Sequence, residues 1–172
     1  DCSNWEALQV PDASTNVSLP SAGVTFDPLI STAGALSNNL ANESPRVLTI
    51  NGTGTLTISG DLTNNSTITH TAGTVTFGGI SPQLIDGSST TAFFNLTLNN
   101  SSSTGLTLNK PVNVSGALTL TDGFLLTDAT NILTILDNAT SSSGSSASFV
   151  DGPIKKIGND AFTFPTGDGT RW

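Results

Sequence analysis

The side chains that most often carry enzymatic chemistry are sparse in this chain of 172 residues. His70 is the single histidine and Cys2 the single cysteine. A serine triad needs a histidine beside its nucleophile, and no Gly-x-Ser-x-Gly turn precedes His70. A zinc site of ordinary composition needs further nitrogen or sulfur ligands, which the sequence around His70 lacks. We therefore predict that His70 is a solvated surface residue at the end of a strand.

Carboxylates are the other side chains that could carry chemistry in this chain. They matter because enzymes built from repeated parallel strands, the parallel β-helices, include polysaccharide lyases and hydrolases. Those enzymes gather two or three carboxylates on one exposed face, often with a basic residue. No Lys or Arg occurs between Arg46 and Lys110, and most aspartates adjoin Gly or Asn, as turn residues do. The spread-out aspartates are Asp61, Asp86, Asp122, Asp128 and Asp137. The sequence predicts no catalytic residue, and we expect no enzyme.

Two Asp-Gly pairs resemble single corners of calcium-binding solenoids. A calcium site needs several oxygen ligands at a fixed period. Asp151-Gly152 and Asp168-Gly169 are isolated in the sequence, so turn formation is the favoured interpretation. We predict neither a metal site nor a cofactor.

The histidine and the aspartates lie among segments that repeat one short sequence pattern. Each repeat of this phrase is an aliphatic residue, a threonine and another apolar residue. Alternation of this kind is typical of a strand with one face in a core and the other in solvent. The phrase occurs at Leu48-Thr49-Ile50, Leu56-Thr57-Ile58, Val75-Thr76-Phe77, Leu96-Thr97-Leu98, Leu106-Thr107-Leu108, Leu118-Thr119-Leu120 and Leu133-Thr134-Ile135. Near-identical strands along one chain favour a stack of equivalent layers.

Turn residues separate these phrases. They are Asn51-Gly52, Gly60-Asp61, Asn64-Asn65, Gly78-Gly79, Asp86-Gly87, Asn99-Asn100 and Asp122-Gly123. Taking every other phrase gives a spacing close to one coil of a parallel β-solenoid. The same dipeptides also form hairpins in an antiparallel β-sandwich. We predict an all-β chain with a parallel β-solenoid, or β-helix-like, repeat array; the antiparallel β-sandwich is the alternative.

Composition excludes several partners. The net charge is −8, and only 10% of residues are charged. Five Lys and Arg residues cannot form the basic stripe that nucleic acid requires. No apolar run approaches the length of a membrane span. We expect no nucleic-acid partner and no membrane insertion.

Four segments follow from the pattern of strands and turns. Residues 1–46 are expected to form an irregular capping segment, in which Val17-Ser18-Leu19 is a short strand and the stretch from Ala33 to Leu40 a helical turn. Residues 47–136 form the repeat array, and residues 137–148 a Ser/Gly-rich link. Residues 149–172 form a C-terminal β segment, with a strand at 161–165, that begins or joins a next module.

Several phrases resemble repeat modules of large surface proteins from Bacteroidetes-type bacteria. They are Val10-Pro11-Asp12-Ala13-Ser14, Gly54-Thr55-Leu56-Thr57-Ile58, Phe94-Asn95-Leu96-Thr97-Leu98, Gly116-Ala117-Leu118-Thr119-Leu120 and Phe149-Val150-Asp151-Gly152-Pro153. The resemblance implies secretion by the type IX route and a place on the cell surface or in an extracellular fibre. It implies no catalytic residues.

Together these patterns predict a non-catalytic, extracellular structural protein: a subunit or repeat module of a surface filament, stalk or sheath. Self-association or contact with neighbouring modules is expected through Phe162, Thr163 and Phe164, because an unpaired strand edge is a template for pairing. Cys2 is the candidate for a disulfide between modules. The alternative is an adhesin module that binds glycans or a surface.

The threonine of each phrase has two interpretations. Stacked threonines can present a regular lattice to ice or to a crystalline polysaccharide. Threonine is also the polar residue best suited to an exposed strand position, and from sequence we favour this second interpretation.

Overall fold

The computed structural model describes residues 12, 14–19, 29–30, 35–169 and 171–172. Within this part of the chain there is no helix, and parallel strands form a β-solenoid of about six turns. The predicted fold class is therefore confirmed. Every pairing between the named strands is parallel, which excludes the antiparallel sandwich.

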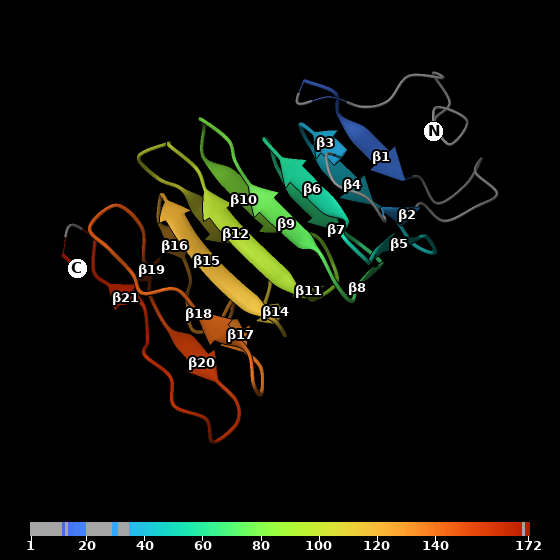
Figure 1. Ribbon diagram of the computed structural model, residues 1–172. Helices are drawn as coiled ribbons and strands as arrows, with labels where there is room; N and C mark the ends of the chain where they lie inside the picture. The colour runs from blue at the N-terminus through green and yellow to red at the C-terminus, as the bar shows by residue number, and fades with distance from the viewer. Residues whose placement is uncertain (1–11, 13, 20–28, 31–34, 170) are drawn as a thin grey trace.

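The coils stack along one axis, so that equivalent strands form three sheet faces (Figure 1). Face 1 contains β1 (Val17–Leu19), β4 (Leu40–Asn42), β7 (Leu62–Asn64), β10 (Gln83–Asp86), β13 (Leu106–Leu108), β16 (Leu125–Leu126), β19 (Val150–Asp151) and β21 (Thr166–Gly167). Face 2 contains β2 (Leu29–Ile30), β5 (Val47–Ile50) and β8 (Thr67–His70), followed by β11 (Thr91–Phe93), β14 (Val112–Val114), β17 (Leu133–Ile135) and β20 (Ile154–Lys156). Face 3 contains β3 (Ala35–Ser37), β6 (Thr55–Ile58), β9 (Thr74–Phe77), β12 (Asn95–Asn99), β15 (Ala117–Asp122) and β18 (Thr140–Ser141).

The repeated phrases build this architecture because successive side chains of a strand point to opposite sides. Aliphatic positions face inward, and the threonines between them lie on the outer side, where Thr134 of β17 is nevertheless buried. Leu56, Val75, Leu96 and Leu118 pair in register on face 3, and each is almost completely buried. The inward residues of all three faces meet in one hydrophobic core that runs through the stack.

The repeat is less uniform than the sequence pattern indicates. Leu96 pairs with Leu118, 22 positions later, whereas Leu106 pairs with Leu125, 19 positions later. Four of the seven Leu-Thr-type phrases lie on face 3, in β6, β9, β12 and β15; the others lie on faces 1 and 2. Coil length varies because the corners differ in length, while the strands keep their register.

Polar side chains connect successive coils at the corner before face 1. The side-chain oxygen of Asn16 accepts the backbone N–H of Asn39 (3.2 Å), and that of Asn39 accepts the N–H of Asp61 (2.7 Å). A carboxylate oxygen of Asp61 then accepts the N–H of Leu84 (2.9 Å). These side chains satisfy backbone donors that the turning chain would otherwise leave unpaired.

Strands also occupy segments in which the sequence indicated less regular structure. β1 to β4 lie within residues 1–46, and β18 lies within the expected Ser/Gly link. The helical turn predicted between Ala33 and Leu40 is wrong for the described residues, which form β3 and β4 around a corner at Asn38 and Asn39. There the Ser37 hydroxyl donates to the Asn39 carbonyl (2.9 Å), which fixes the corner.

The hydrogen-bonded ladder of face 2 is interrupted between β8 and β11. These two strands lie against each other, but they belong to separate sheets. Side chains bridge the gap instead. The N–H of Phe94 donates to Nδ1 of His70 (3.1 Å), and the Asn64 amide donates to the Thr91 hydroxyl (3.1 Å). We call this boundary the face 2 seam.

Candidate functional surfaces

Face 3 carries a column of four threonines on its outer side. Thr57 pairs with Thr76, Thr76 with Thr97, and Thr97 with Thr119, each one strand further along the stack. Thr57, Thr76 and Thr97 are half-buried, and Thr119 is exposed. We call these four residues the threonine column. β6, β9, β12 and β15, which carry it, lie side by side in Figure 1.

A second outward column lies two residues earlier on the same strands. Thr55 pairs with Thr74, Thr74 with Asn95, and the column continues to Ala117. The outward columns of the other faces are mixed in character: on face 1, Leu84, Thr107 and Leu126 follow one another. A threonine column over four strands is therefore specific to face 3 within the described part of the chain.

The acidic residues singled out from sequence are dispersed by the fold and act in corners. Asp61 accepts the N–H of Leu84, and Asp86 accepts that of Gly87 (2.7 Å). Asp128 accepts the N–H groups of Thr130 and Asn131, and the hydrogen bonds from Asn131 help hold the pKa of its carboxyl below the usual range. Among the residues that the structure describes, no group of three or more His, Cys, Asp or Glu side chains could hold a metal ion.

The two Asp-Gly pairs that looked isolated in sequence come together in the last coil. β19 pairs with β21, so Asp151 lies opposite Gly167. A carboxylate oxygen of Asp151 accepts the N–H of Gly169 (3.2 Å). This bond joins two coils across 18 residues. The local turn at Asp168-Gly169 is closed instead by backbone hydrogen bonds between Asp168 and Arg171 (2.9 Å each).

His70 is not the solvated residue that the sequence predicted. Only 9% of its surface is exposed, and it pairs with Ile50 inside face 2. Its ring lies edge-on to Phe93 (6.2 Å between centroids) and Phe94 (6.4 Å). Burial lowers the pKa of the imidazole, and Nε2 has no hydrogen-bond partner. The alternation of β8 would have predicted this burial. His70 lies two positions after the inward Ile68, and therefore on the same side of the strand.

Two buried amides were also missed from sequence. Asn64 and Asn100 were assigned to turns between strands, and the complete burial of both side chains was not predicted. The Asn42 amide donates to Asn64 (3.2 Å), and the Asn100 amide donates to the side-chain oxygen of Gln83 (2.8 Å). The spacing of 22 residues between Asn42 and Asn64, about one coil, could have indicated that these two side chains stack on each other. These groups position the corners and are not directed at a ligand.

The expected self-association residues lie between β20 and β21. The strand predicted at residues 161–165 is not formed, and the next strand, β21, begins at Thr166. Phe162 packs partly against the core and lies edge-on to Phe164 (5.1 Å). Thr163 and Phe164 are exposed, with 48% of the Phe164 surface accessible.

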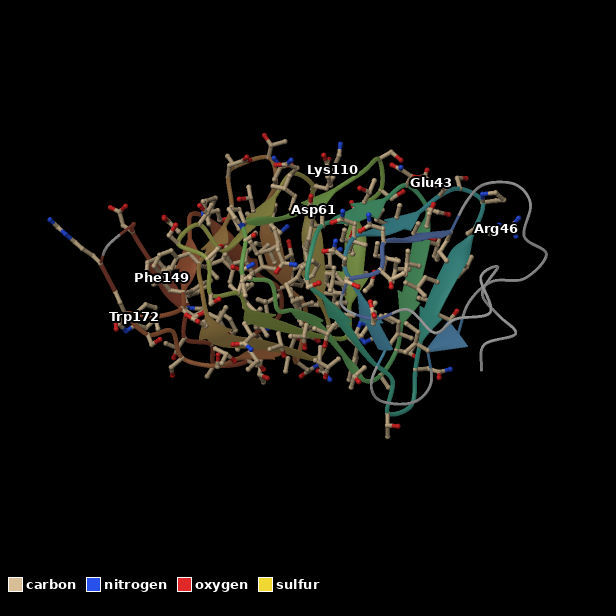
Figure 2. All side chains as sticks on the ribbon, turned by 90° about the horizontal axis from the view of Figure 1, so that it is seen from above. Glu43, Arg46, Asp61, Lys110, Phe149 and Trp172 are labelled. Carbon is tan, nitrogen blue, oxygen red and sulfur yellow. The ribbon has the colours of Figure 1, made fainter. Side chains whose placement is uncertain are left out.

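The last coil also carries a stacked aromatic pair. Phe149 is buried, and the Trp172 ring stacks on it at 6.1 Å with 53% of its own surface exposed. Figure 2 shows this pair at one end of the molecule, far from the labelled charged residues Glu43, Arg46, Asp61 and Lys110. Cys2 lies outside the described residues.

Comparison with family models, with curated proteins and with solved structures finds no match to this chain. No long apolar helix of the kind that crosses a membrane occurs among the described residues.

Proposed function

We propose that this chain is a non-catalytic structural module of an extracellular filament, stalk or sheath on a bacterial cell surface. One observation carries the proposal: a single hydrophobic core runs through all the coils along one axis. In such a stack each coil is stabilised by the coils on either side. Adding coils lengthens the molecule without widening its core, which suits an elongated structural module. The hydrogen-bonded corners add polar connections between the same coils.

The last coil supports assembly with a neighbouring module. Three of the large apolar residues that are exposed in the described chain lie there: Ile157, Phe164 and Trp172. β20 pairs with β17 on one side, and no strand pairs with its other edge in the described chain. Unpaired edges and exposed apolar side chains are features of surfaces that add a further strand or module.

Self-association of the purified chain tests this proposal. We expect Phe164→Ser to shift the sedimentation profile toward the monomer and to shorten any assemblies seen by electron microscopy. Ile80→Ser is the matched control, because Ile80 is 85% exposed but lies at a corner of a central coil. The proposal fails if the unaltered chain stays monomeric at high concentration, or if both variants weaken association equally.

An adhesin module that binds glycans is the second candidate function. The exposed indole of Trp172, held against Phe149, favours it because a stacked aromatic ring offers a flat surface to a sugar ring. A glycan array probed with the unaltered chain and with Trp172→Ala would test this function. Binding that survives the substitution would place the glycan site elsewhere.

A further inference from the structure

The outer side of face 3 carries an array of short side chains in two columns, which are polar except for Ala117 at the end of the second column. In one direction the threonine column follows the stack, where neighbouring strands lie about 4.7–4.9 Å apart. In the other direction Thr55 and Thr57, like Thr74 and Thr76, lie two residues apart, a distance of about 6.6 Å along a strand. The only register shift between β12 and β15 comes after Leu98, beyond Thr97 and Thr119.

Each member of the threonine column presents a hydroxyl and a methyl group. No hydrogen bond within the described chain uses the hydroxyls of these four residues. In the second column, by contrast, the Asn95 amide donates to the Gly73 carbonyl (2.7 Å), and its oxygen accepts the N–H of Ala117 (2.9 Å). Threonine is β-branched, and its side chain has few rotamers on a strand. The array is therefore ordered before anything binds, which lowers the entropic cost of binding a rigid surface.

The chemistry of the array favours a neutral lattice as its ligand. The chain carries a net charge of −8, yet neither the threonine column nor the second column contains a charged residue. The charged residue of these strands is Asp122, at the end of β15, where it pairs with Asn99. Aromatic side chains are absent from both columns; Phe77 of β9 faces the core and is completely buried. A crystalline polysaccharide offers flat apolar ring faces, for which aromatic rings are the suitable partner. Small hydroxyls and methyls suit ordered water instead.

We propose that face 3 binds ice. The strand spacing is close to a repeat of oxygen atoms on surfaces of hexagonal ice, whereas the spacing of alternate residues along a strand matches less closely. Threonine hydroxyls hold water at these positions by hydrogen bonds, as polar groups hold ordered water in protein interfaces. The methyl groups between them restrict the orientation of the same water layer. Ice binding through face 3 is independent of any assembly through Phe164.

Thermal hysteresis and inhibition of ice recrystallisation by the unaltered chain test this proposal. We expect both activities, and we expect Thr97→Lys to reduce thermal hysteresis several-fold because a long charged side chain interrupts the middle of the column. Thr107→Lys is the matched control, since Thr107 is also an outward, half-buried threonine in the middle of the stack, but on face 1. Circular dichroism melting shows whether each variant is folded.

A second substitution keeps the test decisive if Thr97→Lys does not fold. Thr97→Ser keeps the hydroxyl and removes the methyl, and we expect a smaller loss of hysteresis with the fold intact. Three outcomes would overturn the proposal: no ice activity in the unaltered chain, equal loss in folded face 3 and face 1 variants, or binding to crystalline cellulose without any effect on ice.

Discussion

The central coils and the last coil bury their aliphatic residues to different extents. In β12, Leu96 and Leu98 are completely buried between β9 and β15. In the last coil Ile154 is only half-buried, and Ile157 is 41% exposed. Two differences accompany this: β12 has a strand on either side whereas β20 pairs only with β17, and Lys156 of β20 stands opposite buried Ile135 of the preceding coil. In this fold, burial is a property of the stack more than of the individual strand.

The largest expected effect tests this difference directly. Leu96→Ala should lower the free energy of unfolding by about 2–5 kcal/mol, because it leaves a cavity between two coils. Ile154→Ala removes a side chain packed by fewer neighbours and should cost less than about 2 kcal/mol. Urea denaturation of both variants measures the two values. Equal losses would show that the last coil is as tightly packed as the centre.

A glycine pair gives an intermediate effect. Gly73 has a φ of 84°, and a Cβ placed there would meet the carbonyl oxygen of Gly54 in the preceding coil. Gly73→Ala should therefore destabilise the chain by about 2–4 kcal/mol, from left-handed strain plus overpacking. Gly169 of the last coil has a φ of 55° and no atom within 4 Å of that position. Gly169→Ala should therefore lower the free energy of unfolding by about 1 kcal/mol, from backbone strain alone. In thermal melting, Gly73→Ala should have the lower midpoint of the two variants.

The smallest expected effect is a pH dependence of the free energy of unfolding, which arises from His70 in the central coils. Burial lowers the pKa of His70 from its ordinary value of 6.5, so the unfolded chain binds a proton more readily than the folded chain. Its contribution to stability is complete above pH 6.5 and decreases as the pH falls from 6.5 toward the lowered folded-state pKa. Val47–Ile50, Thr67–Thr69 and Thr91–Phe93, which pack around His70, contain no titratable residue.

His70→Gln is the control for this dependence, because glutamine keeps an acceptor for the Phe94 N–H and does not titrate. We expect the unaltered chain to lose stability as the pH falls below 6.5, and the stability of the variant to change less over the same range. In the last coil, the hydrogen bond from Lys156 holds the pKa of exposed Asp160 low, and this pair should respond only at more acidic pH. Parallel pH profiles for both chains would argue against the burial of His70.

Sequence reasoning was successful where the residue pattern is local and regular. The period-2 alternation of Leu56-Thr57-Ile58 and its counterparts defines strands, and their recurrence indicated stacked parallel coils. It was less informative at corners. Asparagine is a residue typical of turns, so the sequence at Asn64 indicated a turn. The side chain is buried because Asn42 of the preceding coil packs against it and donates a hydrogen bond to it. His70 was misplaced for the same reason, since its burial depends on Phe93 and Phe94 from the next coil.

The candidate surface shows the same limit. Each threonine was visible in the sequence, but which threonines share a column was not. The phrases alternate among three faces with unequal corner lengths, so Thr107 belongs to face 1 while Thr97 and Thr119 are neighbours on face 3. Register is set by long-range pairing, and composition alone does not contain it.

The face 2 seam has a mechanical consequence. Along most of the stack, a load applied parallel to the axis is shared by the backbone ladders of three faces. Between β8 and β11, one of these ladders is replaced by side-chain bonds from His70 and Asn64. A stretched molecule should therefore yield at this coil before the other central coils, in which the ladders of all three faces are continuous. In a fibre, such a point of yielding would dissipate tension at a defined place and would spare the remaining coils.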